Sequence, residues 1–168
     1  MNLFFIIDEH TDVSNGVEAQ AQIDIIMDAI NNPYKPRPEG EWIVGEITRQ
    51  CVPQMSIFGW HLTLPRFWLN AIKTSPPSWH QRFITTFESC MAAVVLEATD
   101  RANKHIRSIP DYFRIRRETI GTVPSFALIG MDLGISDEIL QEPSIQTLTN
   151  LATDMIIIAN DLCSYNVE

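Results

Sequence analysis

Residues 78–107 read SWHQRFITTFESCMAAVVLEATDRANKHIR, and this stretch is the strongest indication of the fold class. Its large apolar side chains recur every three or four residues, which places them on one side of a helix: Phe83, Phe87, Met91, Val94 and Val95. Prolines at positions 76 and 77 stop any preceding helix, and Pro110 suits the beginning of the next one. The stretch therefore predicts one long helix with an apolar side.

Shorter helical patterns flank this stretch on both sides. We expect helices over residues 3–12, 13–30, 41–50, 67–73 and 111–120, and a last one from about residue 144 onward. Residues 31–40 hold three prolines and a glycine and are predicted to form a loop. Alternating β-type segments are scarce, so the sequence predicts a single all-α domain of roughly six to eight helices.

The composition is that of a globular protein, with 168 residues, 45% of them hydrophobic, and a net charge of −9. The negative charge argues against nucleic acid as a partner, because binding it requires clustered Lys and Arg. No apolar run approaches the roughly 18 residues of a membrane span. Cys51, Cys90 and Cys163 are odd in number and lack metal-ligand spacing, which favours a reduced, cytoplasmic protein over a disulfide framework.

Oxygen-bearing side chains follow apolar helical runs near both ends of the sequence. Near the first end they are Asp8, Glu9 and Asp12, and near the other they are Asn160, Ser164 and Glu168. A spacing of four residues puts side chains on one helical stripe, roughly 6 Å apart along the axis, where they can close on a hard cation such as Mg²⁺. Each pattern alone also suits a solvated helix end, but its recurrence favours a metal site.

A basic segment lies between these two patterns and contains Arg114, Arg116 and Arg117. The planar fork of arginine suits phosphate oxygens, so metals and arginine together would bind a diphosphate. The same arginines are also compatible with an exposed helix face paired with Glu118. Gly121 is expected to end this helix.

In combination, these residues resemble the sesquiterpene synthases of mushroom-forming fungi, a group of class I terpene synthases that includes protoilludene synthases. The resemblance rests on five stretches in the same order, among them MNLFFIIDEHTDV and NDLCSYNVE: residues 1–13, 35–42, 116–121, 124–128 and 160–168. It implies the all-α class I terpene synthase fold, three Mg²⁺ ions and farnesyl diphosphate as substrate. The implied enzyme is a lyase that ionises the diphosphate and cyclises the cation, here by 1,11-closure toward protoilludene.

The resemblance also implies roles for individual residues. Asp8 matches the main carboxylate ligand of the first metal motif, with Asp12 and Glu9 beside it. The second metal site is matched by Asn160, Ser164 and Glu168. Arg117 matches the diphosphate-sensing arginine because Gly121, four residues further on, falls where the family has its effector glycine. Arg116 and Arg114 are the alternatives for that role.

Two features depart from the family pattern. Family members are longer, with helices before the first motif and an Arg-Tyr pair after the second, so we expect residues 1–168 to be a partial domain without activity of its own. Residues 51–66 separate Arg49-Gln50 from Phe67-Trp68, whose counterparts adjoin in the family. Our hypothesis is that this inserted segment is a retained intron translated in frame, and the alternative is an ordinary loop insertion.

Two rival functions are also compatible with the sequence. The first is a non-catalytic helical remnant that binds metal, or a partner through exposed apolar helix faces. The second is a prenyl-chain-elongating synthase, which would need a second Asp-rich motif where Asn160, Ser164 and Glu168 stand. The sequence carries no signal for a particular oligomeric state.

Overall fold

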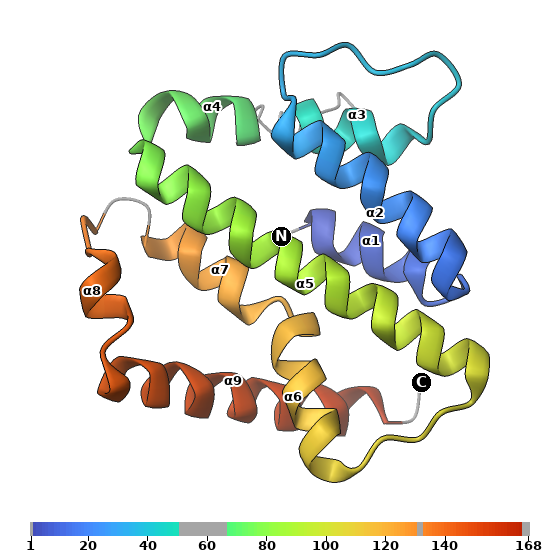
Figure 1. Cartoon of the computed structure of the whole chain (residues 1–168), viewed down its shortest axis with the longest axis vertical. Helices are drawn as coiled ribbons and strands as arrows, with labels where there is room; N and C mark the ends of the chain where they lie inside the picture. Colours follow the sequence, from blue (N-terminus) through green and yellow to red (C-terminus); the bar gives the residue numbers. More distant parts are fainter. Residues whose placement is uncertain (1, 51–66, 131–132, 166–168) are drawn as a thin grey trace, which may run out of the picture.

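A computed structural model describes residues 2–50, 67–130 and 133–165, and these form nine α-helices and no strand (Figure 1). The helices are α1 (Asn2–Thr11), α2 (Gly16–Asn31), α3 (Ile43–Gln50), α4 (Phe67–Thr74), α5 (Pro77–Asn103), α6 (Ile109–Thr119), α7 (Thr122–Ile129), α8 (Asp137–Leu140) and α9 (Pro143–Ser164). The all-α prediction is confirmed. The expected number of helices was too low because α7 and the short α8 were not foreseen.

The long helix α5 is the centre of the fold. It packs against α2, α6 and α7, and Figure 1 shows it crossing the view diagonally, with α1 and α2 on one side and α6 and α7 on the other. Its predicted apolar side is buried at Phe83, Phe87 and Met91, each at most 5% exposed. The periodicity of residues 78–107 therefore identified the helix around which the others pack.

A row of aromatic side chains joins α1, α4 and α5. Trp79 stacks on Phe83 with ring centroids 5.7 Å apart, and Phe83 stacks on Phe87 at 5.6 Å. The edge of Phe4 from α1 meets Phe87 at 5.6 Å, and Trp68 from α4 lies 5.0 Å from Phe83. Since each such pair contributes about 0.5–1.5 kcal/mol beyond the burial of its area, this row stabilises the centre of the domain.

Local sequence signals fix two helix boundaries that differ from the prediction. Asn15 and Glu18 form a reciprocal capping box, each side chain accepting the other's backbone N–H at 3.0 Å. The second helix consequently begins at Gly16 and not at Val13. At its far end α5 stops at Asn103, because Lys104 adopts a left-handed backbone with φ 53.

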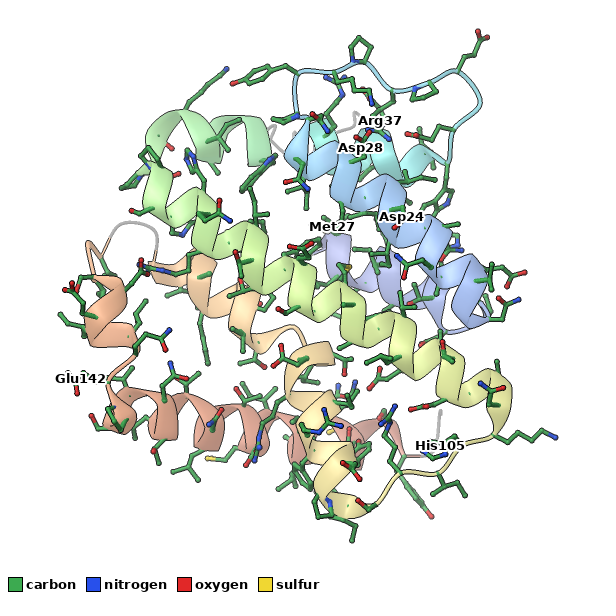
Figure 2. All side chains as sticks on the ribbon, in the orientation of Figure 1. Asp24, Met27, Asp28, Arg37, His105 and Glu142 are labelled. Atoms are coloured by element: carbon green, nitrogen blue, oxygen red, sulfur yellow. The ribbon has the colours of Figure 1, made fainter. Side chains whose placement is uncertain are left out.

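The predicted proline-rich loop separates α2 from α3 and is fixed by Arg37. The Arg37 side chain is 6% exposed and donates to Glu41 Oε2 at 2.6 Å. It also contacts the Asp28 carboxylate near the end of α2, as Figure 2 shows. The hydrogen bond from Arg37 lowers the pKa of Asp28. Loop and helix are thereby joined through one guanidinium.

The turn between α1 and α2 passes very close to α5. A Cβ atom on Gly16 would overlap Thr99 Oγ1 and lie 3.2 Å from Thr99 Cβ. The Thr99 hydroxyl donates to the carbonyl of Val95 at 2.8 Å, which fixes its orientation. Glycine is therefore needed at position 16 for space.

Helix α9 has two unlike sides. Thr153 and Ile157 are buried on the side that faces the rest of the domain. The opposite side, which Tyr165 continues directly after the helix, carries large apolar residues at spacings of three and four, each at least 50% exposed: Leu148, Leu151, Met155, Ile158, Leu162 and Tyr165. We call these six residues the α9 apolar stripe. Their spacing is that of a seam between two packed helices.

Pro124 lies in the first turn of α7, a helix that the sequence pattern did not predict. The first four N–H groups of a helix have no partner within it, so proline loses no hydrogen bond there. The proposed inserted segment, residues 51–66, lies outside the described residues. Within the described ranges, no helix is long and apolar enough to cross a membrane.

Candidate functional site

The acidic residues Asp8, Glu9 and Asp12 are exposed at the carboxyl-terminal end of α1. Arg101 of α5 fixes this end, because its Nη2 donates to the carbonyl of Thr11 at 2.6 Å and its Nη1 lies 3.7 Å from Asp12 Oδ1. A cation at the end of a helix also complements the helix dipole. The acids therefore project from a helix end of defined position.

Asn160 and Ser164 lie one turn apart on α9, as the spacing predicts. Asn160 Oδ1 accepts a hydrogen bond from Arg116 Nη2 at 2.7 Å. Ser164 Oγ is buried, and no described atom forms a hydrogen bond with it. Glu168, the third residue of this pattern, lies outside the described residues.

Arg116 is the arginine that reaches this part of α9. Its side chain is 17% exposed, and Nη2 also lies 3.3 Å from Asp161 Oδ1. Tyr112, one turn earlier on α6, donates its hydroxyl to Asp161 Oδ2 at 2.5 Å. Burial, together with Asp161, raises the pKa of Tyr112 to about 12, so the hydroxyl remains a donor at neutral pH. These contacts fasten α6 to the end of α9 that carries Asn160.

Arg117 and Arg114 point elsewhere. Arg117 forms a two-pronged ion pair with Asp154 of α9, with Nε 2.7 Å from Oδ1 and Nη2 2.8 Å from Oδ2. Hydrogen bonding within this pair lowers the pKa of Asp154 and raises that of Arg117. Arg114 is exposed, 3.5 Å from Asp111 Oδ1. Of these three arginines, Arg116 is thus the one whose described contacts include a predicted metal ligand.

Gly121 follows the end of the arginine-rich helix α6, as predicted. It separates α6 from α7 with φ 73 and ψ 7. This left-handed backbone favours glycine. A Cβ atom at this position would lie 3.5 Å from the ring of Phe4, so the break faces α1. The Gly121 carbonyl accepts the hydroxyl of Ser125 at 2.7 Å and is therefore engaged within α7.

Glu97 of α5 is a part of this region that sequence reasoning missed. Its carboxylate accepts a hydrogen bond from Thr119 Oγ1 at 2.8 Å. Burial raises the pKa of Glu97, while the hydrogen bond from Thr119 and the charges of Arg116 and Arg101 act in the opposite direction. The signal that could have found it is a single acid within the apolar run of residues 91–98.

The oxygen atoms on α1 and α9 suit a hard cation. Carboxylate, amide carbonyl and hydroxyl oxygens are ligands that Mg²⁺ accepts, and Ser164 Oγ, which has no partner in the described part of the chain, is such an oxygen. Because Arg116 already donates to Asn160 Oδ1, a metal at that atom requires the guanidinium to move aside. No group of three or more His, Cys, Asp or Glu gathers among the described residues, so the acids of α1 do not form a cluster of that kind.

A cavity at the beginning of α5 is separate from the predicted metal and diphosphate residues. It has a volume of about 420 Å³ and is lined by residues of α5 and of the segment around α8, among them Trp79, Arg82 and Asp137. None of the predicted site residues lines it.

Comparison with known proteins gives the family and the fold. The family model described as terpene synthase family 2, C-terminal metal binding, matches residues 1–168. The chain is 48% identical over its whole length to a Delta(6)-protoilludene synthase of Hypholoma sublateritium, of which it covers 46%. It is 46% identical to the Delta(6)-protoilludene synthase of Armillaria gallica and 41% identical to sesquiterpene synthase 9 of Postia placenta, covering 44% of each. The chain thus spans less than half the length of these relatives.

Solved structures show the same fold at low sequence identity. An α-eudesmol synthase structure superposes with a TM-score of 0.73 over 99% of this chain and 51% of that chain, at 19% identity. The A224I variant of the ancestral protein SVS_A2 gives a TM-score of 0.77 over 98% of this chain and 45% of that chain, at 18% identity. The described helices are therefore arranged as in part of a terpene synthase domain.

Proposed function

The chain belongs to the terpene synthase family, and on that premise we propose that it carries the metal and diphosphate site of a sesquiterpene cyclase. The proposed reaction is ionisation of farnesyl diphosphate followed by cyclisation of the resulting carbocation. The relatives named Delta(6)-protoilludene synthases favour 1,11-closure toward protoilludene. The apolar surroundings would select the product by shape, since carbocation chemistry requires water to be kept out.

The proposed metal ligands are the oxygen atoms of Asp8 and Asp12 on one side and of Asn160, Ser164 and Glu168 on the other. Mg²⁺, three ions in the arrangement that the family implies, would neutralise the charge on the leaving diphosphate. Of the described ligands, Ser164 has the clearest support, because its buried Oγ has no hydrogen-bond partner among the described residues.

The observation that carries the proposal is the contact between Arg116 and Asn160. It brings a guanidinium, the group best suited to bidentate phosphate binding, next to a predicted metal ligand. Arg117 keeps the expected spacing to Gly121, but it would have to leave its two-pronged pair with Asp154 to bind diphosphate. Arg116 is therefore the better supported diphosphate ligand of the two.

The proposal can be tested by grafting residues 1–168 into the Hypholoma sublateritium relative in place of the segment that they match. We expect the folded chimera to convert farnesyl diphosphate to a cyclic sesquiterpene, detected by gas chromatography and mass spectrometry, with Mg²⁺ but not with EDTA. Ser164→Ala should abolish or strongly reduce the product, whereas Ser144→Ala on the exposed first turn of the same helix should not. A folded chimera that releases no terpene would contradict the proposal.

A second candidate function is binding of a helical partner without catalysis. One observation favours it, which is the exposure of the α9 apolar stripe. If this were the function, the chimera would be inactive, and an amphipathic helix supplied in trans would protect Leu151 and Met155 from solvent. Hydrogen exchange along α9 with and without such a helix distinguishes the two candidates.

A further inference from the structure

We propose that Glu97 is a positioning residue that sets the location of Arg116 and of the break between α6 and α7. Resting as it does on the proposed function, this inference adds a residue of α5 to the diphosphate site. Glu97 has no place in either predicted metal motif, and it belongs to α5, which contacts both α1, directly before Asp12, and α6, which bears Arg116.

Thr119, the last residue of α6, forms hydrogen bonds with two side chains of α5. Its hydroxyl donates to Glu97 Oε1 at 2.8 Å, and its carbonyl accepts a contact from Cys90 Sγ at 3.9 Å. Gly121, with its left-handed backbone, follows two residues later. The turn that leads into the break is therefore attached to α5 through both its side chain and its backbone.

The charge of Glu97 acts on Arg116. Burial lowers the pKa of Arg116, but the neighbouring acidic groups, of which Glu97 acts most strongly and Asp161 also contributes, together leave the pKa raised. The Nη2 atom of Arg116 is directed at Asn160 and Asp161 on α9. The arginine thus lies in the field of a carboxylate from α5 while it presents hydrogen bonds to α9.

Arg101 extends the same arrangement to α1. It stands one helical turn after Glu97 on α5, and its guanidinium holds the Thr11 carbonyl and pairs with Asp12. Two neighbouring turns of one rigid helix therefore locate the acidic end of α1 and the basic end of α6. The separation between Asp12 and Arg116 is set by this part of α5.

If Glu97 positions Arg116, its negative charge is required, whereas a residue that only fills space between helices could be uncharged. A buried carboxylate destabilises a helix that is otherwise apolar, unless cations lie close to it. Glutamine would accept the same hydrogen bond from Thr119 without that cost. The charges of Arg116 and Arg101 favour the negative charge of Glu97, although burial outweighs them and leaves the pKa of Glu97 raised.

The first test is a double-mutant cycle that needs no ligand. The midpoint of thermal unfolding is measured for Glu97→Gln and Arg116→Met, singly and together, in the 168-residue chain. We expect Arg116→Met to lower the midpoint less in the Glu97→Gln background than in the wild type. Arg117→Met is the matched control and should have the same effect in both backgrounds, because Arg117 pairs with Asp154. If Glu97→Gln does not fold, Thr119→Val replaces it in the cycle.

The second test measures binding of inorganic diphosphate in the presence of Mg²⁺ by isothermal titration calorimetry. We expect Glu97→Gln to weaken affinity by about fivefold or more, which is the size of typical couplings between neighbouring groups. Thr119→Val should weaken it similarly, and Thr119→Ser, which keeps the hydroxyl, should restore it. Glu118→Gln on the exposed face of α6 is the control and should leave the affinity unchanged.

The outcomes separate this inference from the proposed function. Equal affinity of wild type and Glu97→Gln overturns the positioning role and leaves the diphosphate site standing. A wild-type chain that binds no diphosphate counts against the proposed function, and the unfolding cycle then decides whether Glu97 acts on Arg116. Equal effects of Arg116→Met in both backgrounds overturn the inference in either case.

Discussion

Burial makes the thiol of Cys90 a poor nucleophile. The side chain is 1% exposed, and burial, together with nearby carboxylates, raises its pKa to about 12. A raised thiol pKa keeps the group protonated and unreactive at pH 8, whereas Cys163 is exposed. We expect iodoacetamide to label Cys163 at least about tenfold faster than Cys90 in the folded chain, as measured by peptide mass spectrometry.

Unfolding provides the control for this prediction. In concentrated urea both cysteines are exposed, and their labelling rates should converge. Equal rates in the folded chain would show that Cys90 is accessible and that its thiol is not stabilised by burial.

The left-handed backbone at Gly121 predicts that a side chain at this position destabilises the fold, and Gly130 provides a control substitution. Gly121→Ala forces a side chain into φ 73, and its Cβ would meet the Phe4 ring only at an ordinary 3.5 Å, so the cost is mainly conformational. We expect a loss of about 1–2 kcal/mol in the free energy of unfolding, measured in urea. Gly130→Ala has φ −75 and open space around the added atom, and should change stability by less than about 0.5 kcal/mol.

At this scale, sequence could predict positions on one helix but not the direction of long side chains. Asn160 and Ser164 share a face because the helix period requires it. Arg116 and Arg117 are adjacent, point about 100° apart on α6 and meet different acids of α9. Which of them reaches Asn160 depends on the crossing of α6 and α9, and no local pattern encodes that crossing.

Among the elements, the pairing of α6 with α9 should respond to pH through Asp154. Hydrogen bonding to Arg117 lowers the pKa of Asp154 in the folded state. The pair therefore contributes fully above the unfolded carboxyl pKa of about 3.9, and its contribution is lost as pH falls through the lower folded value. We expect Asp154→Asn to destabilise the chain at pH 7 and to have little effect at a pH below the lowered folded pKa of Asp154.

Urea unfolding of both proteins at the two pH values checks this prediction. Added salt should reduce the difference at pH 7, since both side chains are partly exposed. An equal loss at both pH values would mean that Asp154 acts through its shape and not through its charge.

Helices with a strong apolar period were predicted well. Helices and helix boundaries that depend on the residues at the helix ends were not. The stretch around Phe83 and Phe87 gave α5 because its buried side is continuous. By contrast, α7 was not predicted, because it is short and contains Pro124, although the first turn of a helix accepts proline. The early end of α5 depends on the left-handed conformation of Lys104, which a lysine rarely adopts.

On the scale of the whole molecule, the α9 apolar stripe should control how the isolated chain behaves in solution. Leu151→Glu with Met155→Lys replaces two exposed apolar side chains by charges. We expect this double variant to bind less of the dye ANS and to associate less with itself, as measured by fluorescence and light scattering, with an unchanged unfolding midpoint.

Ile157 gives the matched control on the same helix. It is fully buried on the opposite side, so Ile157→Glu should destabilise the chain by several kcal/mol. If the stripe variant were destabilised as strongly as Ile157→Glu, the stripe would have to be buried within the domain.

The overall architecture was predictable because its determinants are spread over the whole sequence. The all-α class I terpene synthase fold was expected from helical periodicity and five short stretches, and the family match over residues 1–168 confirms it. The exposure of Leu148 and Leu162 was not predictable, since the sequence pattern of an apolar stripe is the same whether or not another helix covers it. The proposed ligand roles of Asp8, Arg117 and Ser164 remain predictions.

The close approach of Gly16 to Thr99 has a consequence for how this sequence can diverge. Shortening residue 99 to alanine would still leave its Cβ 3.2 Å from a new Cβ at position 16. Either single substitution therefore leaves a tight contact, and a side chain at position 16 requires α2 and α5 to separate by a few tenths of an ångström. Asp12 stands four residues before Gly16. The close contact at Gly16 therefore links the position of the acidic motif to that of the central helix, so that the two segments must diverge together.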